Sequence, residues 1–138
     1  MTNSKQVRLS LERARIILDE ARNLQKKGVY NLVVRRAQEA VELALKGALQ
    51  WVGLDIPRIH DVGGILRQHS ERFPSNFQVS IPKLASISRV LRAEREISFY
   101  GDEDSGLPPE MLYDAADAEE ALSKAVFVLE RCGELLTL

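Results

Sequence analysis

Residues 30–52, YNLVVRRAQEAVELALKGALQWV, decide the fold class of this chain of 138 residues. Apolar residues recur there at four-three spacing, which is the period of an α-helix with one face against a core. The stripe is formed by Tyr30, Val34, Ala37, Val41, Ala44 and Ala48, and Leu45, Leu49 and Val52 widen it. Glu42 and Lys46 are spaced as an i,i+4 ion pair. So broad an apolar surface predicts a central helix that contacts several neighbours, and its small residues would allow a partner helix to approach closely.

The helical period continues along most of the remaining chain. Residues 3–27 and 110–136 each carry one apolar stripe, and residues 61–72 and 81–100 predict a short and a medium helix between them. Turn-forming residues gather at Gly28, at 53–57, at 73–80 and at 101–109. The sequence therefore predicts an all-α fold, a single domain over residues 1–138. Its architecture should be an antiparallel helical bundle of about five helices, three of them long and one a short connecting helix.

The composition narrows the class of protein. Apolar residues at 45% and charged residues at 28% exclude a wholly disordered chain. No apolar run approaches the roughly 18 residues of a membrane helix, and no charged-then-apolar leader opens the chain, so no membrane association is expected. The single cysteine, Cys132, cannot form an internal disulfide, which favours a reducing cytoplasm, and it lies on the last apolar stripe as a core residue. Two histidines and one cysteine argue against a zinc site, and no metal or other cofactor is expected.

The charges are distributed unevenly along the chain. Residues 1–60 carry eleven Lys and Arg against six Asp and Glu, whereas residues 61–138 carry eight against fourteen. Such opposite halves favour head-to-tail contacts within the fold or between copies, although each half could simply have its own solvated faces. DNA is an unexpected partner, because binding to its phosphates requires concentrated positive charge.

Three motifs, in order along the chain, resemble those of one protein family. The first is RAQEAVELALKGAL over residues 36–49, and the second is HDV over 60–62 at the start of the third predicted helix. The third is REISFYGDE over 95–103, followed by PEMLY over 109–113 and an alanine-rich last helix. Together they cover about residues 8–136 and resemble the HEPN domain.

This resemblance implies a cytoplasmic prokaryotic helical domain that commonly forms homodimers and is associated with nucleotide binding. In many members the domain accompanies a small nucleotidyltransferase in a toxin–antitoxin pair. Many members are also metal-independent ribonucleases, in which an arginine, four to six intervening residues and a histidine line a cleft between two subunits. There the arginine can hold the phosphate and the histidine can transfer a proton.

The sequence departs from that ribonuclease motif. Its only histidines are His60 and His69, and no arginine precedes either one at the required spacing. Arg95 is followed after four residues by Tyr100 instead, and a phenol is a poor proton acceptor at neutral pH. We therefore predict no catalytic residue. Asp61 is expected to cap the third helix rather than to form an acid–base pair with the adjacent His60.

The candidate ligand-binding residues are Arg92, Arg95, Glu96, Tyr100 and Asp102. Arg92, Arg95 and Glu96 share a helix face at i, i+3 and i+4, so that two guanidinium groups could hold a phosphate or carboxylate. Tyr100 could stack on a base. The acidic residues 102–104 could hold a hard cation, but a loop that is simply solvated, or that neutralises Arg92 and Arg95, is favoured.

A purely structural interpretation of the same residues is open as well. Arg95 could be tied to Glu94, to Glu96 or to the acidic loop 102–104, with Tyr100 packed against the fold. Elsewhere, Lys26, Lys27, Arg35 and Arg36 form a basic corner that could contact RNA or an acidic partner, or could simply be solvated.

Three functions follow from these observations. The favoured hypothesis is a HEPN-like module without catalysis, expected as a homodimer, that binds a nucleotide- or RNA-like anion and acts with a nucleotidyltransferase partner. The alternatives are a metal-independent ribonuclease toxin that uses Arg95 with Tyr100 or His60, and an interaction scaffold without a ligand.

Overall fold

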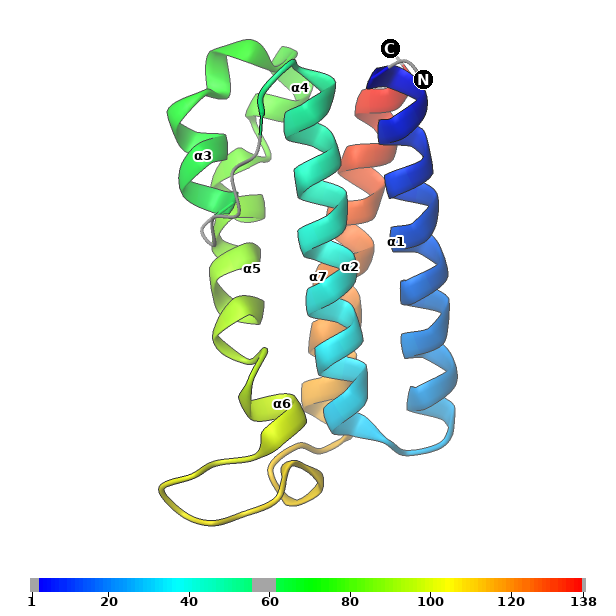
Figure 1. Cartoon of the computed structure of the whole chain (residues 1–138), viewed down its shortest axis with the longest axis vertical. Coiled ribbons are helices and arrows are strands. Elements are labelled where there is room, and N and C mark those ends of the chain that lie inside the picture. The colour runs from blue at the N-terminus through cyan, green and yellow to red at the C-terminus, as the bar shows by residue number, and fades with distance from the viewer. Residues whose placement is uncertain (1–2, 56–61, 138) are drawn as a thin grey trace.

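The computed structural model describes residues 3–55 and 62–137. Its main helices are α1 (Asn3–Lys26), α2 (Tyr30–Trp51), α5 (Ile81–Ala93) and α7 (Ala115–Leu136). Consecutive members of this set run in opposite directions, and α2 lies between α1 and α5 (Figure 1). The shorter elements are α3 (Val62–Gln68), the 3₁₀ turn η1 (Ser70–Arg72), α4 (Ser75–Gln78), α6 (Ile97–Tyr100) and the 3₁₀ turn η2 (Pro109–Met111).

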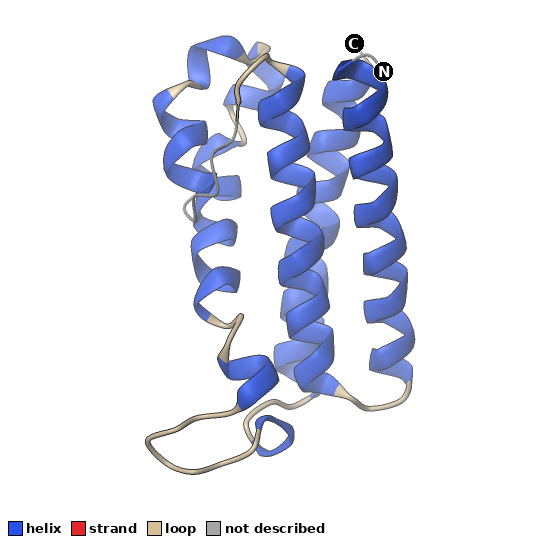
Figure 2. Cartoon of the chain, in the orientation of Figure 1, coloured by secondary structure: helices blue, strands red, loops and turns tan. Residues whose placement is uncertain are grey.

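The described residues contain helices and loops and no strand (Figure 2). The one piece of strand-like pairing among them is an isolated bridge between Asp102 and Leu107. The predicted all-α antiparallel bundle is therefore confirmed, with three long helices.

Helix α2 is the centre of the bundle, as its wide apolar stripe predicted. It contacts the other three main helices, α1, α5 and α7, and the shorter elements α3, α6 and η2. Its buried residues are Asn31, Val33, Val34, Ala37, Gln38, Ala40, Val41, Ala44, Leu45, Gly47, Ala48 and Leu49. Because burial extends so far around this helix, its few polar side chains must find partners on other elements.

Individual residues near the helix ends determine where α1 ends and where α7 begins. Gly28 has a φ of +77°, which a residue with a side chain rarely adopts, and the chain turns there from α1 into α2. Helix α7 begins later than the predicted residue 110. Its N-cap is Asp114, which exchanges hydrogen bonds with Asp117 in a capping box, and residues 109–111 form the separate turn η2.

The predicted helix over 81–100 is wrong in one respect, because it is broken at residues 94–96. Arg35 Nη1 donates to the backbone oxygen of Arg95 over 2.6 Å, and Asn31 Nδ2 donates to that of Ser98 over 3.1 Å. Ser98 is fully buried, and its hydroxyl also donates to the Arg95 oxygen. Side chains of α2 thus occupy the backbone acceptors at the break, and α6 leaves the axis of α5.

Two smaller expectations also change. The predicted helix over 61–72 ends at Gln68 and continues as the 3₁₀ turn η1, and the predicted loop over 73–80 contains the single turn α4. The predicted cap Asp61 and the neighbouring His60 lie outside the described residues.

Cys132 is buried in the core as predicted, and burial raises the pKa of its thiol to about 12. Within the described ranges, no helix has the length and hydropathy needed to cross a bilayer.

Substitution of alanine for each of two buried helical glycines should change the stability of the fold in opposite directions. A Cβ at Gly63 would lie 2.9 Å from the backbone oxygen of Ala85, so α3 and α5 would have to separate. A Cβ at Gly47 would lie 3.6 Å from Val7, which is ordinary contact. We expect Gly63→Ala to lower the free energy of unfolding by about 1–3 kcal/mol, and Gly47→Ala to raise it by up to ~1 kcal/mol.

Urea unfolding followed by circular dichroism measures both values. The two variants control for each other, because both add one methyl group to a buried helical position. A Gly63→Ala protein as stable as the parent would show that α3 does not pack closely on α5.

Candidate functional site

The predicted site residues Arg92 and Arg95 meet at a carboxylate of α2. Nη1 of Arg92 lies 3.6 Å from Oε1 of Glu42, and Nη1 of Arg95 lies 3.3 Å from Oε2. Lys46 Nζ is 3.2 Å from the same carboxylate, which confirms the predicted i,i+4 pair. Three cations thus surround Glu42, a residue that sequence reasoning placed in a helix pair and not in the site.

The carboxylate of Glu42 is held in its charged form. Burial raises the pKa of Glu42, but the hydrogen bond from Gln38 and the charges of Lys46 and Arg95 outweigh burial, so that the pKa lies below its usual value. The Glu42 side chain is 18% exposed, so screening by solvent is weak there. Even with the more distant Glu96, which lies 3.8 Å from Arg95, carboxylates are fewer than cations, and the cluster retains positive charge.

The alternative partners proposed for Arg95 are arranged differently. Arg95 Nε lies 3.8 Å from Oε1 of Glu96, as the structural interpretation predicted. Glu94 instead accepts a hydrogen bond from the hydroxyl of Tyr113. Burial, that hydrogen bond and the charges of Glu94 and Asp117 raise the pKa of Tyr113, which keeps this hydroxyl a donor.

Asp102 organises its own loop. Its Oδ1 accepts from the backbone N–H of Asp104 over 3.1 Å, and its Oδ2 accepts from the hydroxyl of Ser105 over 3.0 Å. Its backbone pairs with that of Leu107. The described ranges contain no group of three or more His, Cys, Asp or Glu side chains placed to hold a metal ion.

Tyr100 and its neighbour Phe99 form an exposed aromatic pair on α6. Tyr100 is 68% exposed and Phe99 49%, and their ring centroids lie 4.9 Å apart in an edge-on arrangement. The guanidinium of Arg35 lies 5.0 Å from the centroid of Phe99, while its Nη1 is bound to the backbone of Arg95. Tyr100 is therefore not packed into the fold, and Phe99 and Arg35 join the candidate site.

Two of these participants could not be assigned from sequence spacing. Arg35 belonged to the predicted basic corner, more than fifty residues away from the predicted site. Phe99 carried one usable signal, since it directly precedes the predicted site residue Tyr100. A groove of about 450 Å³ opens beside Phe99, between α1 and α2.

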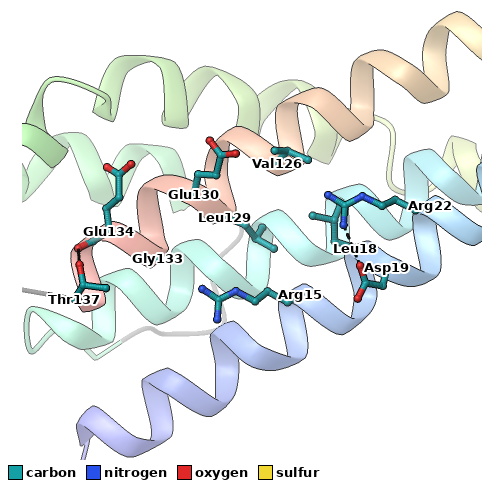
Figure 3. Close-up of a pocket in the computed structure, with 10 residues that line it drawn as sticks. All are labelled: Arg15, Leu18, Asp19, Arg22, Val126, Leu129, Glu130, Gly133, Glu134 and Thr137. Carbon is teal, nitrogen blue, oxygen red and sulfur yellow. Dashed lines mark hydrogen bonds and ion pairs between the residues drawn. The ribbon is translucent and has the colours of Figure 1, made fainter.

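A second groove, of about 630 Å³, lies between α1 and α7 (Figure 3). It is lined by Arg15, Leu18, Asp19, Arg22, Val126, Leu129, Glu130, Gly133, Glu134 and Thr137. Its charged groups pair with neighbours on their own helices: Arg22 lies 2.9 Å from Asp19 and Arg15 lies 3.7 Å from Glu12, while Glu130 and Glu134 both pair with Arg131. This balance distinguishes the groove from the α6 end of the bundle, where cations exceed carboxylates around Glu42.

The described residues include one imidazole, that of His69. His69 joins α3 to η1, and these elements lie near the end of the bundle opposite to α6 (Figure 1). The other histidine, His60, lies outside the described residues. In the described part of the chain, Arg95 thus has a phenol, and not an imidazole, at the spacing of the ribonuclease motif.

Comparison with known proteins identifies the family. Residues 7–135 match the model of the HEPN domain, so the chain belongs to the HEPN family, as its motifs predicted. The protein TT1696 from Thermus thermophilus has a similar structure, with a TM-score of 0.75 and 27% identity over 94% of this chain and 97% of that one. ST0689, an archaeal HEPN homologue, is similar with a TM-score of 0.72 and 25% identity over 94% of this chain and 97% of that one. No curated protein matches the chain.

The lowered pKa of Glu42 predicts a contribution to acid sensitivity. The stabilisation is present above the ordinary pKa of 4.5 and is lost as the pH falls through the lower pKa of the folded state. We expect Glu42→Gln to lower the free energy of unfolding at pH 7 by about 1–3 kcal/mol. The variant should also lose less stability than the parent between about pH 5 and pH 3.

Urea unfolding at a series of pH values tests this expectation. Glu96→Gln is the matched control, because the Glu96 side chain is 72% exposed and its distance to Arg95 is long; its effect should stay within about 0.5 kcal/mol. An equal acid dependence in Glu42→Gln and the parent would contradict the role assigned to Glu42.

Proposed function

We propose that this chain is a HEPN module without catalytic activity that binds a nucleotide- or RNA-like anionic ligand at the α6 end of the bundle. In this proposal it forms a homodimer in the cytoplasm and acts with a small nucleotidyltransferase in a toxin–antitoxin-type system. One observation carries the binding function: the exposed rings of Phe99 and Tyr100 lie beside the guanidinium of Arg35, which is itself bonded to the backbone oxygen of Arg95.

Rings and guanidinium groups supply the two contacts that a nucleotide needs. A base can stack on an exposed aromatic ring whatever its identity, at about 1–3 kcal/mol per base. A guanidinium has five N–H donors, of which Arg95 uses Nη1 toward Glu42 and Nε toward Glu96. The remaining donors can reach a phosphate, and the excess of cations around Glu42 favours an anion there.

The proposed absence of catalysis rests on proton transfer. Attack by a ribose 2′-hydroxyl requires a group that accepts its proton, and a protonated phenol is a poor acceptor. Tyr100 occupies the position of the motif histidine relative to Arg95. The arrangement therefore supports holding an RNA phosphate more than cleaving the RNA.

The proposed partners rest on family membership and charge. The excess of acidic residues in 61–138 and of basic residues in 1–60 suits contacts between copies or with a second protein. A small nucleotidyltransferase encoded beside this chain and retained with it through purification would support that partner.

Ligand binding is tested with ATP, GTP and a short RNA by equilibrium titration. Tyr100→Ala should weaken binding of at least one of them by about tenfold, the value of one stacked base. Arg95→Ala should weaken the same ligand by a similar factor, because it removes a charged donor.

The control is Arg67→Ala, which removes an exposed guanidinium from α3 that donates only to the backbone oxygen of Pro82 among its described contacts. Binding equal to the parent is expected for this variant. Failure of all three ligands to bind, or unchanged binding in both site variants, would refute the proposed site.

A second prediction concerns cleavage. RNA should stay intact on long incubation with a high concentration of the protein without added metal. Cleavage that disappears in Arg95→Ala would contradict the non-catalytic function and would favour the ribonuclease alternative.

A further inference from the structure

The groove beside Phe99 is lined by both charged and apolar residues. Residues of α1 and α2 form its two walls, and α6 contributes Phe99 at one end. The lining residues are Glu20, Asn23, Leu24, Lys27, Leu32, Arg35, Arg36, Glu39 and Phe99. The volume of about 450 Å³ falls within the range of sites for small ligands, about 300–1,000 Å³.

Both carboxylates of the groove converge on the same cation. Arg36 Nε lies 3.4 Å from Oε2 of Glu20, and Arg36 Nη1 lies 3.1 Å from Oε1 of Glu39. These contacts hold the negative groups at one place in the groove, across the interface between α1 and α2.

The two other cations are left without a carboxylate. Arg35 donates to the backbone oxygen of Arg95 and lies over the ring of Phe99, and neither contact neutralises its charge. Lys27 is exposed at the end of α1, and no carboxylate of the described residues forms an ion pair with it. Lys27 and Arg35 therefore present positive charge to whatever enters the groove.

We propose that this groove binds a phosphate monoester attached to a flat ring, either a free nucleoside monophosphate or the 5′-phosphorylated end of an RNA. This inference rests on the proposed function and specifies its ligand. A phosphate monoester carries about −1.5 to −2 charges at pH 7, whereas an internal phosphodiester carries one. Two uncompensated cations therefore favour the terminal group over the internal one.

The apolar part of the lining suits the ring of the same ligand. Leu24 and Leu32 are partly buried in the walls, and about half of Phe99 is accessible at the end of the groove. A ring placed against Phe99 continues toward Tyr100, whose centroid is 4.9 Å from that of Phe99. The groove thus joins the proposed stacking surface, and a monophosphate in it would present its base to α6.

Adjacent lysines provide a matched pair of variants. Lys27 lines this groove, whereas Lys26 lines a different one, with Arg22, Gln25, Glu119, Leu122, Ser123 and Val126. Both are exposed and belong to the same helix end, so their removal has the same effect on net charge and on the helix dipole. Only Lys27→Ala should affect a ligand in the groove.

The experiment titrates the full chain with AMP, adenosine, and one short RNA bearing either a 5′-phosphate or a 5′-hydroxyl. We expect AMP to bind more tightly than adenosine, and the 5′-phosphorylated RNA more tightly than its 5′-hydroxyl form. Lys27→Ala should weaken binding of the phosphorylated probes by about tenfold, and Lys26→Ala by less than about twofold. Tight binding of AMP alone identifies the free nucleotide, and tight binding of the RNA end alone identifies the polymer.

Two results would overturn the inference. Equal binding of phosphorylated and hydroxyl probes would do so, as would equal effects of Lys27→Ala and Lys26→Ala. If either result is obtained while Tyr100→Ala still weakens RNA binding, the proposed function stands without the groove. Failure of every probe to bind would refute both the ligand assigned to the groove and the proposed binding function.

Discussion

The structure depends on how α2 satisfies its polar side chains while it is buried on several sides. Asn31, at 5% exposed, and Arg35 donate to the backbone oxygens of Ser98 and Arg95. Each bond compensates a buried group that would otherwise be costly to desolvate. Together they fix where α5 ends and in which direction α6 departs. The positions of Phe99 and Tyr100 follow from this arrangement, and so does one end of the groove between α1 and α2.

Charge balance separates the surfaces of the bundle. Along α1 and α7, each charged group that lines the groove pairs with a neighbour on its own helix. Around Glu42, three cations share one carboxylate, and beside Phe99 two carboxylates share Arg36. The excess of positive charge is thus a property of how the groups are distributed and not of their number, because the chain as a whole has a net charge of −1. That distribution makes the α6 end the favoured place for an anion.

The fold could be predicted from the sequence because burial imposes a period that is visible in each long helix. The break at residues 94–96 could not, because Ser98 lies two helical turns after Leu91, and a continuous helix would place it on the same face as Leu84 and Ile87. In the structure Ser98 is buried and Ile97 is 40% exposed, as an unbroken helix would also have them, so that the break shows only in the hydrogen bonds from Asn31 and Arg35 of α2. The same limit applies to the site. Arg92, Arg95 and Tyr100 are close in sequence, whereas Glu42 and Arg35 reach them through tertiary packing.

Cys132 has a practical consequence for chemistry on this protein. It is the only sulfhydryl of the chain, it is fully buried, and its pKa of about 12 leaves almost no thiolate at neutral pH. Alkylating reagents and mild oxidants should therefore not react with the Cys132 thiol in the folded protein. A cysteine introduced on α6 would be the single reactive handle, so that a fluorophore or spin label could be attached there without altering the native sequence elsewhere.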